Sequence, residues 1–262
     1  MPSSGKDVVL YEKKGHIAIL TMNRPERMNA LGGGMSERLA ECWTDFAEDE
    51  NLWVAILTGT GERAFCAGAD LRERAEADAA GTTSRRRPPL PTLGAGLECW
   101  KPTIAAINGY AIAGGWMLAQ RCDIRIAAEH AELGIAEARW NISAGWICDL
   151  TRIIGLGHAL EIVLWGDKRI TAQRAYEIGF VNKVAPKEQL MDEAMSWAER
   201  MLDLAPQAVR NFKEILYRGY YLTTEQGLAL ARHIERNLAG MEDSIEGPKA
   251  FSEKRKPVFK GR

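Results

Sequence analysis

The chain has 262 residues, of which 46% are apolar and 26% are charged, and this composition is that of a globular protein rather than a disordered or fibrous one. Its 34 Lys and Arg residues nearly balance its 35 Asp and Glu residues, so no strong positive field favours a nucleic-acid partner. No apolar run reaches the length of a membrane span, and residues 1–6 lack the layout of a signal peptide. We therefore expect a cytoplasmic protein without a membrane partner, made of one large domain or one domain with a small helical appendage.

The first 60 residues predict a hairpin, a helix and a strand. Residues 8–11 and 17–20 are rich in β-branched side chains and are separated by a Lys-Lys-Gly turn, which is typical of a β-hairpin. Residues 35–48 carry apolar side chains at helical spacing, and residues 54–59 form a compact apolar run typical of a buried strand.

The rest of the chain predicts an α/β core followed by helices. Residues 104–107 and 124–127 read as further buried strands, with glycine-rich turns and short helical patterns between them. Residues 74–94 are small and polar and include three arginines at 85–87, so we expect a long mobile loop there. From about Gly155 onward strand signals fade and helical spacing dominates.

The cysteines and histidines predict no metal site and no disulfide framework. The five cysteines are scattered and contain no CxxC pair: Cys42, Cys66, Cys99, Cys122 and Cys148. The four histidines have neither metal-ligand spacing nor a triad arrangement. We expect reduced, mostly buried thiols, no metal and no tightly bound cofactor.

Two turns rich in small residues are candidate ligand sites. Residues 64–71 follow a buried strand, and their small side chains would let a ligand approach the backbone closely. Residues 107–118 run from a strand through glycines into a helix, whose first N–H groups have no partner within the helix. Either turn alone is equally compatible with close packing, but two such turns could direct two N–H donors at one oxygen and form an oxyanion hole.

The order of several segments along the chain resembles the crotonase (enoyl-CoA hydratase/isomerase) superfamily. The similarity covers nearly the whole chain and rests on the motifs at residues 23–25, 29–31, 64–71, 101–111, 122–127, 166–167, 172–181 and 251–256. It implies an α/β fold built as a spiral of strand-strand-helix repeats, with a helical C-terminal region that packs trimers, often paired as hexamers. By this resemblance, residues 1–195 form the spiral core and residues 196–262 form the helical oligomerisation region.

The resemblance also implies roles for individual residues. The oxyanion donors would be the N–H groups of Ala69 and Gly114, which would hold the thioester oxygen of an acyl-CoA, and Arg72 would lie near the coenzyme A nucleotide. The remaining substrate-binding candidates flank these positions or follow Glu137: Cys66, Ala67, Gly68, Asp70, Leu71, Gly115, Trp116, Met117 and Trp140. The tryptophans could line a pocket for a flat acyl group or could belong to the core.

The hydratases that this chain resembles use two glutamates twenty residues apart, and only the second is present. It is Glu137, whereas Met117 occupies the first position and can neither hold a water by charge nor transfer a proton. Moving a double bond needs only one base, which takes a proton from one carbon and returns it to another. A single Glu137 therefore favours isomerase-like chemistry over efficient hydration.

Two alternatives to this function follow from the same sequence. Asp149 could be the nucleophile or base of an acyl-CoA hydrolase or dehalogenase, or it could be a surface or helix-capping residue. The chain could also be a non-catalytic relative that binds coenzyme A or RNA, although its near-neutral charge argues against RNA. Residues 85–87 could meet coenzyme A phosphates or be a solvated charge run.

Overall fold

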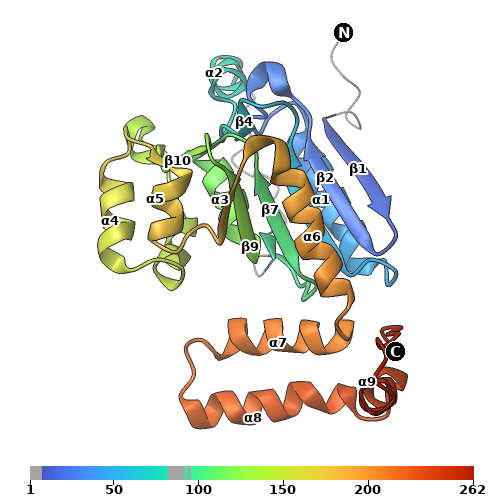
Figure 1. The fold of residues 1–262 in the computed structure, drawn as a ribbon. Coiled ribbons are helices and arrows are strands. Elements are labelled where there is room, and N and C mark those ends of the chain that lie inside the picture. The colour runs from blue at the N-terminus through green and yellow to red at the C-terminus, as the bar shows by residue number, and fades with distance from the viewer. Residues whose placement is uncertain (1–7, 82–91, 94–95) are drawn as a thin grey trace.

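The centre of the molecule is a six-stranded sheet with the strand order β1-β2-β3-β7-β9-β12 (Figure 1). The structure is a computed structural model that describes residues 8–81, 92–93 and 96–262. The first two strands form the expected antiparallel hairpin, and the other neighbours pair in parallel. The strands are β1 (Val9–Lys14), β2 (Ile17–Met22), β3 (Val54–Gly59), β7 (Thr103–Ile107), β9 (Ile124–Ala128) and β12 (Lys183–Ala185).

A smaller four-stranded sheet has the order β11-β10-β8-β4. Its strands are β4 (Ala64–Cys66), β8 (Tyr110–Ile112), β10 (Glu132–Gly134) and β11 (Ile170–Thr171). In the units β3-β4-α2, β7-β8-α3 and β9-β10-η2, the first strand joins the large sheet and the second joins the small one. The chain thus passes repeatedly between two sheets. A separate pair of short parallel strands is formed by β5 (Thr92–Leu93) and β6 (Gly96–Leu97).

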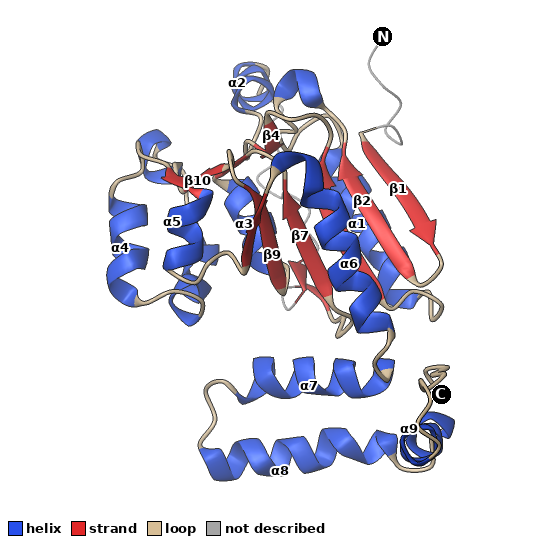
Figure 2. Ribbon diagram, in the orientation of Figure 1, coloured by secondary structure: helices blue, strands red, loops and turns tan. Residues whose placement is uncertain are grey.

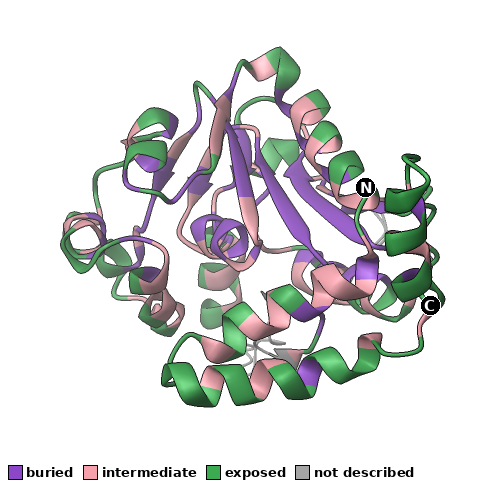
Figure 3. Ribbon diagram, turned by 60° about the horizontal axis from the view of Figure 1, so that its bottom comes forward, coloured by how far each residue is buried: buried purple, intermediate pink, exposed green. Residues whose placement is uncertain are grey.

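Helices cover the large sheet on both faces (Figure 2). One face packs on α6 through a cluster of buried apolar side chains, and the other packs on α1 and α3 in the larger core cluster. Burial is concentrated in the sheets and in the helix faces toward them (Figure 3). The α-helices are α1 (Met35–Glu48), α2 (Leu71–Ala79), α3 (Gly114–Arg121), α4 (Leu156–Leu164), α5 (Ala172–Glu177), α6 (Leu190–Leu202), α7 (Pro206–Gly219), α8 (Thr224–Ile234) and α9 (Glu242–Ser252). The 3-10 helices are η1 (Pro25–Arg27), η2 (Glu137–Trp140), η3 (Gly145–Arg152), η4 (Lys187–Gln189) and η5 (Glu235–Leu238).

The prediction of one long loop over residues 74–94 is wrong for its first part. Helix α2 begins at Leu71, where the Asp70 side chain caps it by accepting hydrogen bonds from the backbone N–H groups of Arg72 and Glu73, and it continues to Ala79 through residues of high helix propensity. The polar composition of this segment marks a solvated helix that lacks any buried residue. Residues 85–87, which could meet phosphates, lie outside the described residues.

The C-terminal helices α7, α8 and α9 lie beyond one edge of the sheets (Figure 1). Helix α6 spans the predicted boundary at residue 195, and its buried residues pack on the large sheet. Helix α7 contacts the sheet region through Lys213, whose ammonium pairs with Asp123 at 2.7 Å. The use of residues 196–262 for oligomerisation stays a prediction.

The described residues include the five cysteines, of which four are buried and only Cys148 is exposed. This agrees with the expectation of mostly buried thiols, and their reduced state stays a prediction. No group of three His, Cys, Asp or Glu side chains among the described residues could hold a metal ion. No helix in the described part of the chain is long and apolar enough to cross a membrane.

Candidate active site

The predicted catalytic groups follow the carboxyl ends of three neighbouring strands of the small sheet. Strands β4, β8 and β10 are adjacent and parallel. Ala69 follows the end of β4 by three residues, Gly114 follows β8 by two, and Glu137 follows β10 by three. Because the carboxyl ends of parallel strands lie at the same edge of a sheet, these three residues gather there. This edge is the candidate active site.

The two glycine-containing turns pack directly against each other. A Cβ atom added to Gly68 would lie 2.9 Å from the Cβ atom of Ala113 and 3.1 Å from the backbone nitrogen of Gly114. Gly68 also has a φ of +86°, which favours glycine. Leu31 holds the first turn in place, since its N–H donates to the Gly68 carbonyl at 2.7 Å. The close approach of the two backbones therefore depends on glycine at position 68.

The N–H groups of Ala69 and Gly114 have unused hydrogen-bonding capacity. Within the described residues, neither N–H group donates a hydrogen bond to another protein group. Their neighbours do: the Ala113 N–H donates to the Gly134 carbonyl at 2.8 Å, and the Met117 N–H donates to the Ala113 carbonyl at 3.1 Å. Gly114 is the first residue of α3, where N–H groups have no intrahelical acceptor. Two such donors in adjacent turns are suited to binding one oxygen.

Ala113 carries backbone strain beside this donor pair. Its φ is +56° and its ψ is −118°, a conformation that costs a residue with a Cβ atom about 1–3 kcal/mol. The hydrogen bond to Gly134 links the strained turn to the end of β10, and the chain reaches Glu137 three residues later. Strained backbone of this kind is concentrated at functional sites, which supports the assignment of this edge.

Glu137 is a buried carboxyl group with an unsatisfied oxygen. It is the first residue of η2 and is 6% exposed, and its Oε2 atom is buried without a hydrogen-bond partner among the described residues. Burial raises the pKa of Glu137 above its ordinary value, although hydrogen bonding to the backbone of Glu137 and Ala136 and to the Trp146 side chain opposes part of this rise. A carboxyl group with a raised pKa and a free oxygen is suited to taking up and releasing a proton during a reaction.

Met117 lies one helical turn beyond Gly114 on α3. Its side chain is partly buried and packs against the larger core cluster. The position that would carry the first glutamate is therefore occupied by an apolar side chain at the edge of the core.

Several predicted substrate-binding residues have packing roles. Cys66 is fully buried in β4, and a Cβ atom on Gly115 would lie 1.9 Å from its carbonyl oxygen, so α3 and β4 touch backbone to backbone. Trp116 is fully buried, with its ring 4.2 Å from that of Phe180, which supports the core alternative rather than a pocket wall. Trp140 is 55% exposed.

A shallow cavity of about 290 Å³ opens beside Ala69. The turn at residues 67–72 forms one wall, including Ala67, Asp70, Leu71 and Arg72, and the segment around η1 forms the other. Arg27 of η1 lines this cavity together with Arg72, and both side chains are exposed. Sequence reasoning missed Arg27, although it lies between two of the motifs that carry the family resemblance. Asp70 pairs with Arg24 at 3.3 Å in addition to capping α2.

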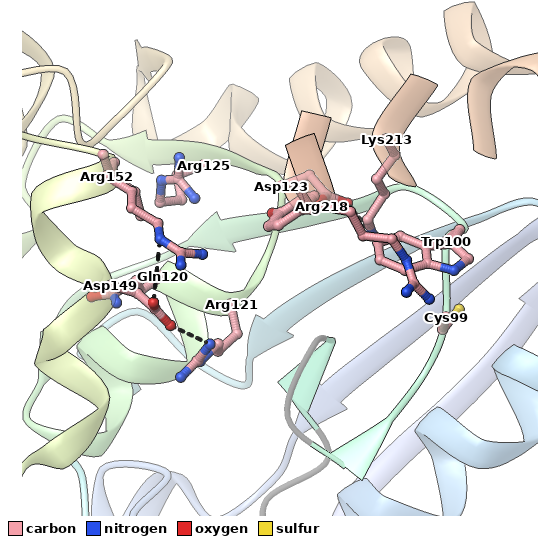
Figure 4. Close-up of a pocket in the computed structure, with 12 residues that line it drawn as sticks. Cys99, Trp100, Gln120, Arg121, Asp123, Arg125, Asp149, Arg152, Lys213 and Arg218 are labelled. Carbon is pink, nitrogen blue, oxygen red and sulfur yellow. Dashed lines mark hydrogen bonds and ion pairs between the residues drawn. The ribbon is translucent and has the colours of Figure 1, made fainter. Parts of the chain in front are cut away.

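Asp149 lies in a second cavity, at the other end of α3 (Figure 4). Its carboxylate is 3.0 Å from Nη1 of Arg121 and 3.5 Å from Nε of Arg152. Both flanking guanidinium groups neutralise the charge that a nucleophile or base would use. Asp149 is also inside η3 rather than at its N-cap, so the helix-capping interpretation is wrong.

Comparisons with known proteins define the family. The protein-family model for enoyl-CoA hydratase/isomerase matches residues 12–262. The chain is 37% identical to the (E)-benzylidenesuccinyl-CoA hydratase of Thauera aromatica, over 97% of this chain and 99% of that protein. It is also 37% identical to the 2,3-dehydroadipyl-CoA hydratase of Escherichia coli, over the same shares of the two chains.

Solved structures agree with the sequence comparisons. The crystal structure of an enoyl-CoA hydratase from Bacillus anthracis aligns with a TM-score of 0.87 at 37% identity and covers 97% of this chain and 100% of its own. The chain belongs to the enoyl-CoA hydratase/isomerase family. The crotonase-like α/β fold that the sequence resemblance implies is confirmed.

Proposed function

We propose that this protein catalyses proton transfer on an enoyl-CoA thioester, with Glu137 as the single acid and base and an enolate as the intermediate. The observation that carries the proposal is the pairing of two unused backbone donors with one buried carboxyl group at the same sheet edge. The family membership and the printed activities of the relatives support coenzyme A thioesters as the substrate class.

The reaction begins at the carbon next to the thioester carbonyl. The Glu137 carboxylate removes a proton from this carbon, and the electron pair moves onto the carbonyl oxygen, which the N–H groups of Ala69 and Gly114 stabilise. Removing one such donor from an oxyanion hole typically costs about 3–4 kcal/mol of transition-state stabilisation. The protonated Glu137 then returns the proton two carbons further along the chain, so the double bond moves and no water is consumed.

The substrate would lie between the two turns and the shallow cavity beside Ala69. In this arrangement Arg27 and Arg72 would meet the phosphates of the coenzyme A nucleotide, because exposed guanidinium groups bind phosphate oxygens well. Coenzyme A is then part of the substrate, and the chain's own residues supply all of the acid–base chemistry.

Met117 supports isomerisation over hydration. Hydration needs a group that activates water on the β-carbon in addition to the group that serves the α-carbon, and Met117 cannot do this. The hydratase names of the relatives nevertheless favour hydration as a second candidate. In that case Glu137 alone would both activate the water and supply the proton.

The test is to replace Glu137 with Gln and to measure turnover of a 3-enoyl-CoA and of crotonyl-CoA. We expect kcat for the isomerisation to fall by about 10²–10⁴, the usual contribution of a general acid or base. The matched variant Met117→Glu, which adds a carboxylate one turn beyond Gly114, should raise hydration of crotonyl-CoA. Unchanged turnover in Glu137→Gln would remove Glu137 from the mechanism, and faster hydration than isomerisation by the wild-type protein would favour the second candidate.

A further inference from the structure

A cavity of about 270 Å³ lies at the C-terminal end of α3, between η3 and α7 (Figure 4). Five basic side chains line it, but only two carboxylates, those of Asp123 and Asp149, do so. The basic residues are Arg121, Arg125, Arg152, Lys213 and Arg218. The proposed reaction assigns no role to this cavity.

The excess positive charge is concentrated on one wall. Lys213 is neutralised by Asp123 at 2.7 Å, and Arg218 is neutralised by Glu98 at 2.5 Å and Glu214 at 2.8 Å. On the opposite wall, Arg121 and Arg152 share a single carboxylate, that of Asp149. The Arg125 guanidinium lies beside them and, within the described ranges, donates only to the backbone carbonyls of Cys122 and Phe180. Two guanidinium groups on this wall therefore share one carboxylate, and the third, that of Arg125, adds further positive charge.

Two buried polar atoms at the same wall have no partner among the described residues. They are Nε of Arg121 and Oε1 of Gln120. Gln120 is 5% exposed, and its amide nitrogen donates to the Trp146 carbonyl at 3.3 Å, which fixes the orientation of the amide. An unsatisfied buried polar atom is unfavourable, so a polar guest that supplies a partner at this wall would be stabilised.

The cavity and the candidate active site lie at the two ends of α3. Gly114 is the first residue of α3 and Arg121 is the last, and seven steps along an α-helix cover about 10 Å. Met117 and Gln120 are three residues apart and so share a face of this helix. The Trp146 side chain opposes part of the rise that burial causes in the pKa of Glu137, and its carbonyl accepts the Gln120 hydrogen bond at 3.3 Å.

We propose that this cavity binds the far end of the acyl group and selects acyl-CoA thioesters whose chain ends in a carboxylate. The proposal rests on the proposed function, because that function places the thioester oxygen at Gly114. The distance of about 10 Å corresponds to an acyl chain of about eight carbons. The carboxylate accepts from the Arg121 guanidinium, on the wall where Nε of Arg121 and Oε1 of Gln120 are buried without partners among the described residues.

The experiment compares pairs of enoyl-CoA thioesters of six, eight and ten carbons that differ only in a terminal methyl or carboxylate group. For the wild-type protein, kcat/KM for the carboxylate-ended substrate should exceed that for the methyl-ended one at least about tenfold, with the largest ratio near eight carbons. In Arg121→Gln this ratio should fall to near one. In Asp149→Asn, which removes the competing anion, the ratio should rise.

Arg38→Gln is the matched control, since Arg38 on α1 also pairs with a carboxylate and has a buried Nε without a partner among the described residues, but it does not line this cavity. It should leave the ratio of the two kcat/KM values unchanged. Calorimetric titration with saturated, unreactive acyl-CoA pairs measures the same preference without turnover.

The outcomes separate this proposal from the proposed function. Equal kcat/KM and equal Kd values for the two chain ends would overturn the distal carboxylate site and leave the catalytic proposal standing. A preference in Kd without turnover of any enoyl-CoA would support the distal site and overturn the catalytic proposal. A third outcome concerns free anions: citrate or inorganic phosphate could bind the wild-type protein and bind Arg121→Gln more weakly. If such an anion does not weaken acyl-CoA binding, the cavity is a free-anion site and the acyl assignment is overturned.

Discussion

Glu137 combines three properties that are unfavourable for a purely structural residue. It is buried, one of its oxygens is unsatisfied among the described residues, and its pKa is raised. A core that used this position only for packing would be more stable with a neutral side chain. Retaining a carboxylate here costs folding free energy, and the proposed proton transfer would account for that cost.

This cost gives a pH-dependent prediction. Because the folded-state pKa of Glu137 lies above its unfolded value near 4.5, the folded state binds more protons between these two values, and its stability falls as pH rises through that interval. Glu137→Gln should therefore be more stable than the wild type by on the order of 1 kcal/mol at pH 7–8. The gain should shrink as the pH is lowered toward 4.

Denaturant unfolding of both proteins at a series of pH values from 4 to 8 measures this difference. Other titrating groups contribute equally to the two proteins and cancel. A difference in unfolding free energy that stays constant with pH would contradict the raised pKa of Glu137.

At the scale of elements, the candidate site is produced by the parallel order of β4, β8 and β10. Each strand ends at the same edge, and the turn after each one supplies a single functional group. The backbones of the first two turns touch, so the relative position of the two N–H donors depends on the absence of a side chain at Gly68.

Replacing Gly68 with Ala should therefore damage catalysis more than stability. The new Cβ atom would meet Ala113 and the Gly114 nitrogen, and it would shift one oxyanion donor relative to the other, so we expect kcat to fall by about 10²–10³. Gly81→Ala is the matched control, because Gly81 also has a positive φ but has nothing within 4 Å of the added atom. Steady-state kinetics and thermal unfolding of both variants separate the two effects. Equal losses of activity in the two variants would refute a specific role for the turn.

At the scale of the whole molecule, the C-terminal helices expose large apolar side chains. Leu216 on α7 is 72% exposed, and this region contributes further examples on α7, α8 and α9: Phe212, Leu228, Ile245 and Phe251. Large exposed apolar surfaces mark interaction sites in soluble proteins. They support the prediction that residues 196–262 join copies of the chain into a trimer or hexamer.

Sedimentation equilibrium tests this assembly. The wild-type protein should have the mass of three or six chains, and Leu216→Glu should shift it toward the monomer, because a charge would be buried in an apolar contact. Leu10→Glu, at an exposed apolar position on β1 outside this region, should leave the mass unchanged. A monomeric wild-type protein would contradict the prediction.

Local sequence patterns were sufficient to predict many of the strands and helices of the fold. Two β-branched runs around a glycine turn predicted the hairpin of β1 and β2, compact apolar runs predicted β3, β7 and β9, and helical spacing predicted the C-terminal helices. These features are local because strand and helix periods and turn chemistry act between residues close in the chain. The polar composition of residues 74–79 misled the loop prediction, because the Asp70 cap and solvation were enough to form α2 there.

The sequence by itself determined the family, the two small-residue turns and the presence of Met117 and Glu137 at their positions, since each depends on the identity of a residue and its place in an ordered series of motifs. Only the tertiary structure decided that Trp116 is buried against Phe180, that the Glu137 oxygen lacks a partner, and that Asp149 is held between Arg121 and Arg152. Burial and charge pairing depend on which segments meet, and the Arg121–Asp149 pair joins residues 28 positions apart. Sheet order and helix packing set such distances, and no local pattern along the chain encodes them.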